Sequence, residues 1–227
     1  MGGVIFLVIF VGILALYFGK PFKKDSGRAR YDLYSKDKTE EQKKVLRYFL
    51  LKNDGGCLAK ETNNLVSDSE FNRLVENFLD RNNLKQEALD RIGVDESQVQ
   101  EVKPINFWGF LYDANYRKWN NKGDFKSSSV QTSWLFFSKD QVYLFQKTMK
   151  LDENSTNFRT EEYFYKDIVN FSTRTEERDL AGRKYIENTF SVIVPGDKFD
   201  CTLLPNMDSA ERSIQGMKAK LREKKNA

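Results

Sequence analysis

Lys166 and Asp167 are the first residues to consider for chemistry, because a lysine beside a carboxylate could act as a catalytic acid–base pair. They lie within EEYFYKDIVNF, residues 161–171, directly after three clustered aromatic residues. Adjacent residues of a β-strand point to opposite faces of the sheet, so the two side chains could not easily act on one substrate. We therefore interpret Lys-Asp as a bend or bulge between two strand segments, with catalysis as the alternative.

The composition excludes most other classes of catalytic site. The chain contains no histidine, which excludes Ser-His-Asp and Cys-His catalysis, histidine-ligated metals and a histidine pH switch. It has no phosphate-binding loop, no dinucleotide-binding glycine motif, no nucleophile elbow and no cluster with metal-ligand spacing. Acidic neighbours such as Glu161-Glu162 and Glu176-Glu177 lie in polar stretches and are expected to be solvated. We predict neither enzymatic activity nor a cofactor.

The two cysteines, Cys57 and Cys201, are far apart and form no C-x-x-C pair. One pair cannot support a disulfide framework, which favours a reducing compartment. Cys201 lies on the same face of an expected strand as Phe199 and Leu203. This pattern predicts a buried core thiol rather than a reactive one.

Basic charge is concentrated near the two ends of the folded region. The net charge is +4, and residues 20–30 carry net +4 while residues 212–227 carry net +5, so the remainder sums to −5. The basic residues of the last helix are candidates for binding anionic phospholipid: Lys218, Lys220, Arg222, Lys224 and Lys225. Alternatively, Ile214, Met217 and Leu221 pack that helix on the β structure and the basic side chains are solvated. The acidic middle of the chain argues against nucleic acid as a partner.

Residues 2–19, GGVIFLVIFVGILALYFG, contain no charged side chain. A helix of this length spans about 27 Å, enough for the hydrocarbon core of a bilayer. A cleaved signal peptide and a buried core helix are the alternatives, but no basic residue precedes the run, no typical cleavage site follows it and it has no polar face. Basic residues follow only on its C-terminal side. The positive-inside rule then predicts a single-pass protein of the cell membrane with its soluble domain in the cytoplasm.

Helical patterns follow a polar stretch at residues 25–38. Thr39 and Gln42 form a capping-box pattern at the start of the first helix. Residues 71–79 place apolar side chains at i, i+3, i+4, i+7 and i+8, which predicts a second helix. A third should end at Gly93, with one further short turn capped by Asp95. These helices either pack on one another and on the downstream half of the chain, or form a docking platform for a partner.

From about residue 105 the apolar period changes to 2, which indicates β-strands. VQTSWLFF and VYLFQKTMKL flank SKDQ and predict a hairpin in which Phe137 pairs with Val142 and Trp134 with Phe145. Both faces of this hairpin are apolar, so the aromatic face must be covered by the helical segment or by a partner. Four apolar residues of a later strand share one parity and are expected to face the core: Ile186, Phe190, Val192 and Val194.

Seven strands followed by one helix are predicted, at 105–113, 130–138, 141–150, 159–167, 168–174, 183–194 and 198–204. This order, with WLFFSKDQVYLF followed by EEYFYKDIVNF, resembles the pleckstrin-homology-like (PH-like) superfold in its bacterial and GRAM-like forms, over about half of the chain. The resemblance implies lipid or protein binding without catalysis. It also implies lipid contacts from the first strand-connecting loop, whose basic residues here are Arg117, Lys118 and Lys122. A solvated loop is the alternative, because the spacing in YRKWNNKGDFK departs from the lipid-binding pattern.

The predicted fold class is α+β. A transmembrane helix is expected at 1–19, a basic linker at 20–38, a small helical segment at 39–103, and a seven-stranded PH-like β-barrel or sandwich capped by a C-terminal helix at 104–227. The expected function is a membrane-anchored cytoplasmic binding module that recruits a protein partner or senses inner-leaflet lipid. The alternative is a structural or assembly protein that acts through its helical segment and aromatic sheet face.

Overall fold

The computed structural model describes residues 27–51, 65–81, 83–100, 102–120, 122–153, 155–203 and 208–226. The helices are α2 (Gly27–Tyr34), α3 (Glu40–Leu50), α4 (Asp68–Arg81), α5 (Leu84–Ile92), the 3₁₀ turn η2 (Glu96–Val99) and α6 (Asp208–Asn226). The strands are β1 (Val102–Phe110), β2 (Arg117–Trp119), β3 (Phe125–Ser127), β4 (Ser129–Phe137), β5 (Gln141–Lys150), β6 (Ser155–Phe164), β7 (Asn170–Leu180), β8 (Arg183–Val194) and β9 (Asp197–Leu203).

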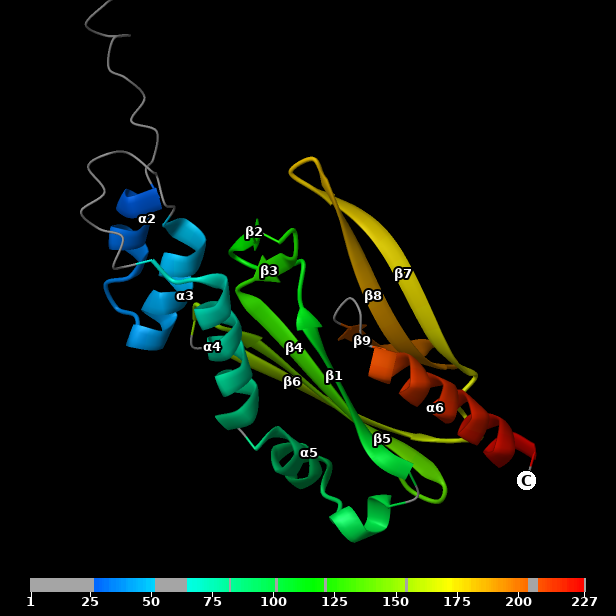
Figure 1. The fold of residues 1–227 in the computed structure, drawn as a ribbon. Coiled ribbons are helices and arrows are strands. Elements are labelled where there is room, and N and C mark those ends of the chain that lie inside the picture. The colour runs from blue at the N-terminus through cyan, green and yellow to red at the C-terminus, as the bar shows by residue number, and fades with distance from the viewer. Residues whose placement is uncertain are drawn as a thin grey trace, which may run out of the picture.

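These strands form three sheets (Figure 1). The first is a four-stranded antiparallel sheet in the order β1-β4-β5-β6, the second is the short β2-β3 hairpin, and the third has the order β7-β8-β9. In the four-stranded sheet the predicted register of the β4–β5 hairpin is confirmed, because Phe137 pairs with Val142 and Trp134 with Phe145. The alternation of apolar residues and the short polar turn therefore located this hairpin correctly.

The predicted fold class is wrong. The chain is mostly β, with nine strands in three sheets across the described residues rather than seven in one barrel or sandwich. The two strands that sequence analysis missed are β2 and β3, which lie in the segment expected to be a polar loop. They contain only three residues each, too few to show a period of 2, and the aromatic side chains of Trp119 and Phe125 hold them in place by ring contacts with Tyr185 of β8.

The transmembrane helix is also not supported. No helix within the described ranges is long and apolar enough to cross a membrane, and the predicted span at residues 1–19 lies outside them. The predicted linker is wrong for residues 27–34, which form α2. This short helix is held by packing that its polar sequence does not reveal, because Tyr31 is buried against Leu46 and Leu50 of α3.

The helix boundaries follow local signals. Thr39 and Gln42 form the predicted capping box, in which the Gln42 backbone N–H donates to Thr39 Oγ1 and the Thr39 N–H donates to Gln42 Oε1. Gly93 ends α5 with φ of 79°, a left-handed conformation that glycine adopts without steric cost. Asp95 caps η2, as predicted.

The helices cover the β structure rather than standing free. Tyr48 of α3 stacks on Phe71 of α4 with ring centroids 4.1 Å apart, and both belong to one apolar cluster with Phe110 of β1 and Val130 of β4. On the outer aromatic face of the four-stranded sheet, Phe136 and Phe145 pack against Ala88 and Leu89 of α5. A largely buried ion pair between Glu87 Oε2 and Lys147 Nζ, 2.7 Å long, joins α5 to β5. These contacts confirm the packing interpretation, while the predicted boundary at residue 103 stays a prediction.

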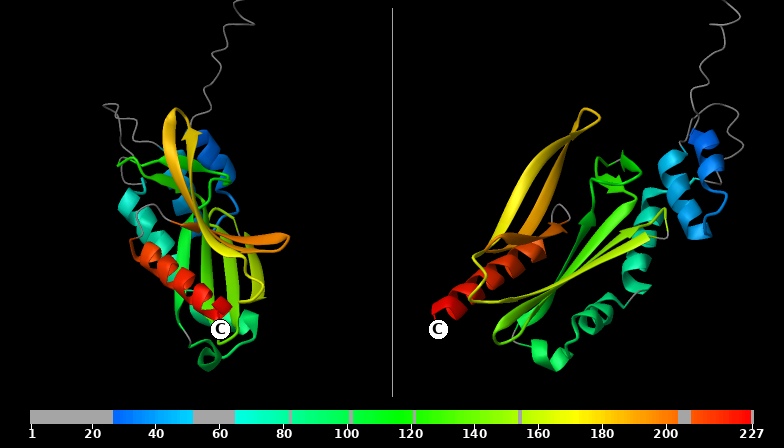
Figure 2. Two further views of the ribbon diagram at one scale, coloured as in Figure 1. Left: turned by 90° about the vertical axis from the view of Figure 1, so that its right-hand side faces the viewer. Right: turned by 180° about the vertical axis from the view of Figure 1, so that it is seen from behind.

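The main core lies between the two larger sheets and under α6. Phe107 and Leu135 from the first sheet meet Phe190 and Val192 from the third, and Met217 of α6 reaches the same cluster. Ile186 is the exception among the residues of β8 that were predicted to face the core, because it is 41% exposed. Ile186 pairs with Glu177 in the β7–β8 hairpin, which extends as a long arm in Figures 1 and 2.

The first and third sheets are joined where β9 crosses β1 and β4. Gly109 permits close approach, since an added Cβ would lie 2.9 Å from Thr202 Cγ2 and 3.2 Å from the Leu203 carbonyl carbon. At this crossing, hydrogen bonds made by two glutamine side chains join the sheets in place of a ladder of backbone hydrogen bonds. Gln131 Oε1 accepts from the Thr202 N–H at 3.1 Å, and Gln146 Nε2 donates to the Asp200 carbonyl at 2.7 Å.

Candidate binding groove between β7 and α6

A groove of about 340 Å³ separates the start of β7 from one side of α6. Its strand side is the continuous segment 169–173, and its helix side contains the apolar Leu221 and three basic side chains. We call this feature the β7–α6 groove. It is lined by Val169, Asn170, Phe171, Ser172, Thr173, Lys218, Leu221, Arg222 and Lys225.

The helix side of the groove is strongly basic. Lys218, Arg222 and Lys225 are spaced i, i+4 and i+7, which places them along one stripe of a helix. Among the described residues that line the groove, none is Asp or Glu. In the described part of the chain, neither Lys218 nor Arg222 makes an ion pair, whereas the Lys225 ammonium donates to the Val169 carbonyl at 3.1 Å. The groove therefore collects positive charge without internal neutralisation.

The strand side of the groove is an edge. Within the described part of the chain, β7 is the terminal strand of its sheet, hydrogen-bonded to β8 on one side. Neighbouring residues of a strand point to opposite faces, so a groove that contacts five consecutive residues runs along the backbone edge rather than over one face. Val169, just before β7, is 56% exposed. An edge strand presents backbone donors and acceptors that its own ladder does not use.

The five predicted lipid-binding residues of α6 divide into two groups. Lys218, Arg222 and Lys225 line the groove, as described above. Lys220 instead forms an ion pair with Glu223 at 3.1 Å, and the Lys224 ammonium lies 5.9 Å from the centre of the Tyr165 ring. The sequence could not separate these groups, because only the packing of Ile214, Met217 and Leu221 defines which side of the helix faces β7.

The three predicted loop residues lie elsewhere and do not line the groove. The Arg117 guanidinium donates to the Tyr112 carbonyl at 3.0 Å and lies over the Tyr112 ring. The Lys118 ammonium donates to the Tyr48 carbonyl at 2.6 Å and lies 3.4 Å from the centre of the Tyr48 ring. Burial lowers the pKa of Lys118, although the charge of Asp68 opposes this. Lys122 is exposed in the turn between β2 and β3.

Lys166 and Asp167 occupy the turn between β6 and β7, which confirms the predicted bend. The Asp167 N–H donates to the Phe164 carbonyl at 2.9 Å, and the Lys166 ammonium lies 5.4 Å from the centre of the Phe164 ring. Both side chains are exposed.

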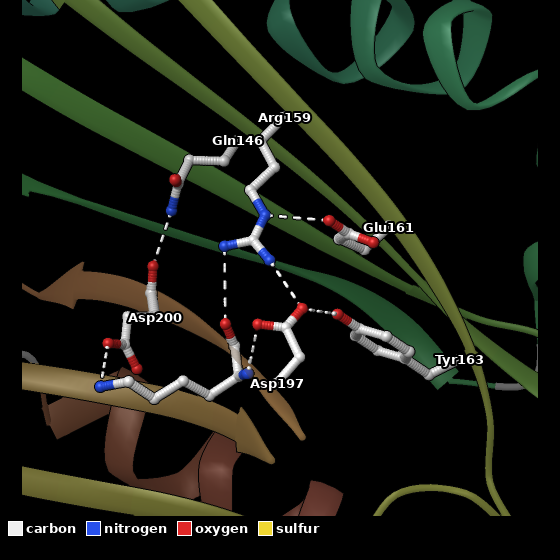
Figure 3. Close-up of polar contacts among 7 residues, drawn as sticks. Gln146, Arg159, Glu161, Tyr163, Asp197 and Asp200 are labelled. Atoms are coloured by element: carbon white, nitrogen blue, oxygen red, sulfur yellow. Dashed lines mark hydrogen bonds and ion pairs between the residues drawn. The ribbon is translucent and has the colours of Figure 1, made fainter. Parts of the chain in front are cut away.

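A second cluster of charged side chains joins β6 to β9 (Figure 3). The Arg159 guanidinium donates to Glu161 at 3.0 Å and to Asp197 at 3.1 Å, and the Tyr163 hydroxyl donates to Asp197 at 3.5 Å. Burial lowers the pKa of Arg159, but the hydrogen bond and charge of Glu161 outweigh it and raise the pKa overall. Burial raises the pKa of Tyr163. These contacts join β6 of the first sheet to β9 of the third sheet.

Among the described residues, no group of three or more acidic or cysteine side chains could hold a metal ion. Comparisons with protein-family models, with curated proteins and with solved structures find no match to this chain. The resemblance to PH-like domains therefore stays a prediction. The β7–α6 groove is the best candidate site on its geometry and charge alone.

Proposed function

We propose that this chain is a non-catalytic binding module that recruits a protein partner by holding an acidic segment of it in the β7–α6 groove. The observation that carries the proposal is the stripe of Lys218, Arg222 and Lys225 facing a groove without a carboxylate. Charge-assisted hydrogen bonds from such side chains to carboxylates are about twice as strong as neutral ones. A partner with several acidic side chains would gain from all three.

An anionic lipid surface is the second candidate, supported by a different observation. Phe164 and Val169 are 47% and 56% exposed at the two ends of the β6–β7 turn, and Lys166 and Lys225 lie beside them. Exposed apolar side chains flanked by lysines are typical of surfaces that contact anionic bilayers. The groove favours a polypeptide, because it follows five consecutive residues at a strand edge.

The experiment measures binding of the full chain to two probes. The first is a fluorescein-labelled peptide rich in glutamate, followed by fluorescence anisotropy, and the second is vesicles that contain phosphatidylserine. We expect saturable peptide binding that weakens as salt is raised from about 0.05 to 0.5 M, because the groove charges become screened. Vesicle binding without peptide binding would overturn the proposal in favour of the lipid surface.

Matched variants locate the binding site. Replacing Lys218, Arg222 and Lys225 together by glutamine should abolish peptide binding. The control replaces Arg212, Lys220 and Lys224 by glutamine, which removes the same charge from the same helix but outside the groove. If both variants bind the peptide equally well, the groove is not the site and the proposal is wrong.

A further inference from the structure

We propose that the acidic segment binds as an added β-strand along the free edge of β7, with an acidic side chain at every second position. This inference rests on the proposed function and specifies how the partner is recognised. Three observations carry it: the groove follows the strand edge, its three basic residues form one stripe along α6, and one edge carbonyl already faces α6.

The edge carbonyl belongs to Val169. It accepts a hydrogen bond from the Lys225 ammonium at 3.1 Å, so a backbone acceptor just before β7 points out of the sheet toward α6. Segment 169–173 lines the groove without interruption. An extended polypeptide placed there could exchange main-chain hydrogen bonds with β7, the usual way in which an exposed sheet edge binds a peptide. A compact anion such as free phosphate would leave most of this edge unused.

The spacing of the basic side chains determines the expected sequence pattern. With a rise of about 1.5 Å per residue, Lys218 and Arg222 are about 6 Å apart along the helix axis, and Arg222 and Lys225 about 4.5 Å. Alternate residues of an extended strand lie about 6.8 Å apart and point to the same face. Lysine and arginine side chains are flexible enough to span the difference between these intervals along the helix and the repeat of the strand. Acidic residues at i, i+2 and i+4 would therefore each reach one basic group.

Contiguous acidic residues fit less well. In a strand of three consecutive glutamates the middle side chain points away from the other two, so no more than two could face α6. Non-specific attraction between opposite charges would not distinguish the two arrangements. A preference for alternating over contiguous acidic residues therefore distinguishes binding as an added strand from simple attraction between opposite charges.

The experiment uses the full chain and three labelled peptides of equal length and charge, measured by fluorescence anisotropy. One carries Glu-Thr-Glu-Thr-Glu at its centre, the second carries Glu-Glu-Glu-Thr-Thr, and the third is the alternating peptide with N-methyl groups on the backbone nitrogens of the central glutamate and the threonine after it, so that one methyl group faces β7 in either placement of the strand. We expect the alternating peptide to bind at least about tenfold more tightly than either of the others, since each of them loses contacts with α6 or with β7. Amide hydrogen exchange in the segment 169–173 should slow only with the alternating peptide.

The possible outcomes separate the two proposals. Equal affinity for all three peptides, abolished by replacing Lys218, Arg222 and Lys225 with glutamine, would leave the proposed function standing and overturn strand addition. Failure of every peptide to bind would overturn both. Preference for the alternating peptide that persists in the glutamine variant would place the strand on another edge and also overturn this inference.

Discussion

At the scale of single residues, the contacts that a basic side chain already makes within the protein determine whether it can bind a ligand. Lys118 caps a carbonyl near the C-terminal end of α3 and lies over the Tyr48 ring, so its charge is already engaged within the protein. Arg222, on an exposed helix face, makes no ion pair among the described residues and faces a groove. Sequence alone assigned both to lipid binding, and the structure gives them different surroundings.

Cys201 is expected to be unreactive in the folded protein. Its side chain is fully buried on β9, and burial raises the pKa of the thiol to about 12, so almost no thiolate exists at neutral pH. In a Cys57→Ser variant, a disulfide reagent such as dithionitrobenzoate should label Cys201 only after denaturant unfolds the chain. Rapid labelling without denaturant would show that β9 is not packed in the core as described.

At the scale of elements, the crossing of β1 and β9 depends on a glycine. A Cβ at Gly109 would lie 2.9 Å from Thr202 Cγ2 and 3.2 Å from a backbone carbon, so Gly109→Ala should lower the free energy of unfolding by about 1–3 kcal/mol. Gly216 is the matched control, because it lies within α6 and an added Cβ would meet no atom within 4 Å. Gly216→Ala should raise stability by about 0.5–1 kcal/mol through helix propensity. Urea denaturation measures both, and a Gly109→Ala variant as stable as wild type would contradict the close crossing.

The attachment of α5 to the sheet depends on a largely buried ion pair. The Lys147 side chain is 8% exposed and pairs with Glu87, so Glu87→Ala would leave a buried ammonium without its carboxylate. We expect a loss on the order of 3 kcal/mol, and a smaller loss for Lys147→Met, which removes the charge but keeps the volume. Glu96→Ala, which breaks the exposed pair with Lys85, should cost less than about 1 kcal/mol. The reverse order of stabilities in urea denaturation would refute this account of how α5 is held.

At the scale of the whole molecule, polar contacts at β9 make stability depend on pH. Burial raises the pKa of Asp200, but the hydrogen bonds from Lys198 and Ser191 outweigh it and lower the pKa overall. A carboxylate with a lowered folded-state pKa stabilises the fold above its ordinary pKa of about 4, and this contribution is lost as the pH falls through the folded-state value. Asp200→Asn should therefore lower the melting temperature at pH 7, and the difference from wild type should shrink progressively below about pH 4.

Thermal denaturation from pH 7 to pH 3 tests this expectation. A difference between wild type and Asp200→Asn that stays constant over the whole range would mean that the Asp200 charge contributes nothing to stability. A further comparison uses Glu177→Gln, because Glu177 pairs with Lys184 on the exposed arm. Its effect on the melting temperature should be small at every pH.

Local sequence signals determined the elements whose hydrogen bonds or packing are short-range. The capping box at Thr39, the left-handed end of α5 at Gly93 and the register of the β4–β5 hairpin all follow from residues within a few positions of one another. The same is true of the burial of Phe190, which follows from the alternation of apolar residues along β8. Such features depend little on the rest of the chain, so sequence alone could predict them.

Tertiary structure decided the remainder, because the relevant contacts join residues far apart in the sequence. β2 and β3 are too short to show a period, and they depend on contacts such as that of Trp119 with the Leu180 carbonyl. Beyond Thr173 strand β7 is polar as far as Leu180, so no apolar alternation marked its full length. The β7–α6 groove arises only when α6, about 45 residues downstream, packs on the core beside the start of β7. The sequence by itself determined that α6 is basic, and the packing of its apolar stripe determined which of those charges face a ligand.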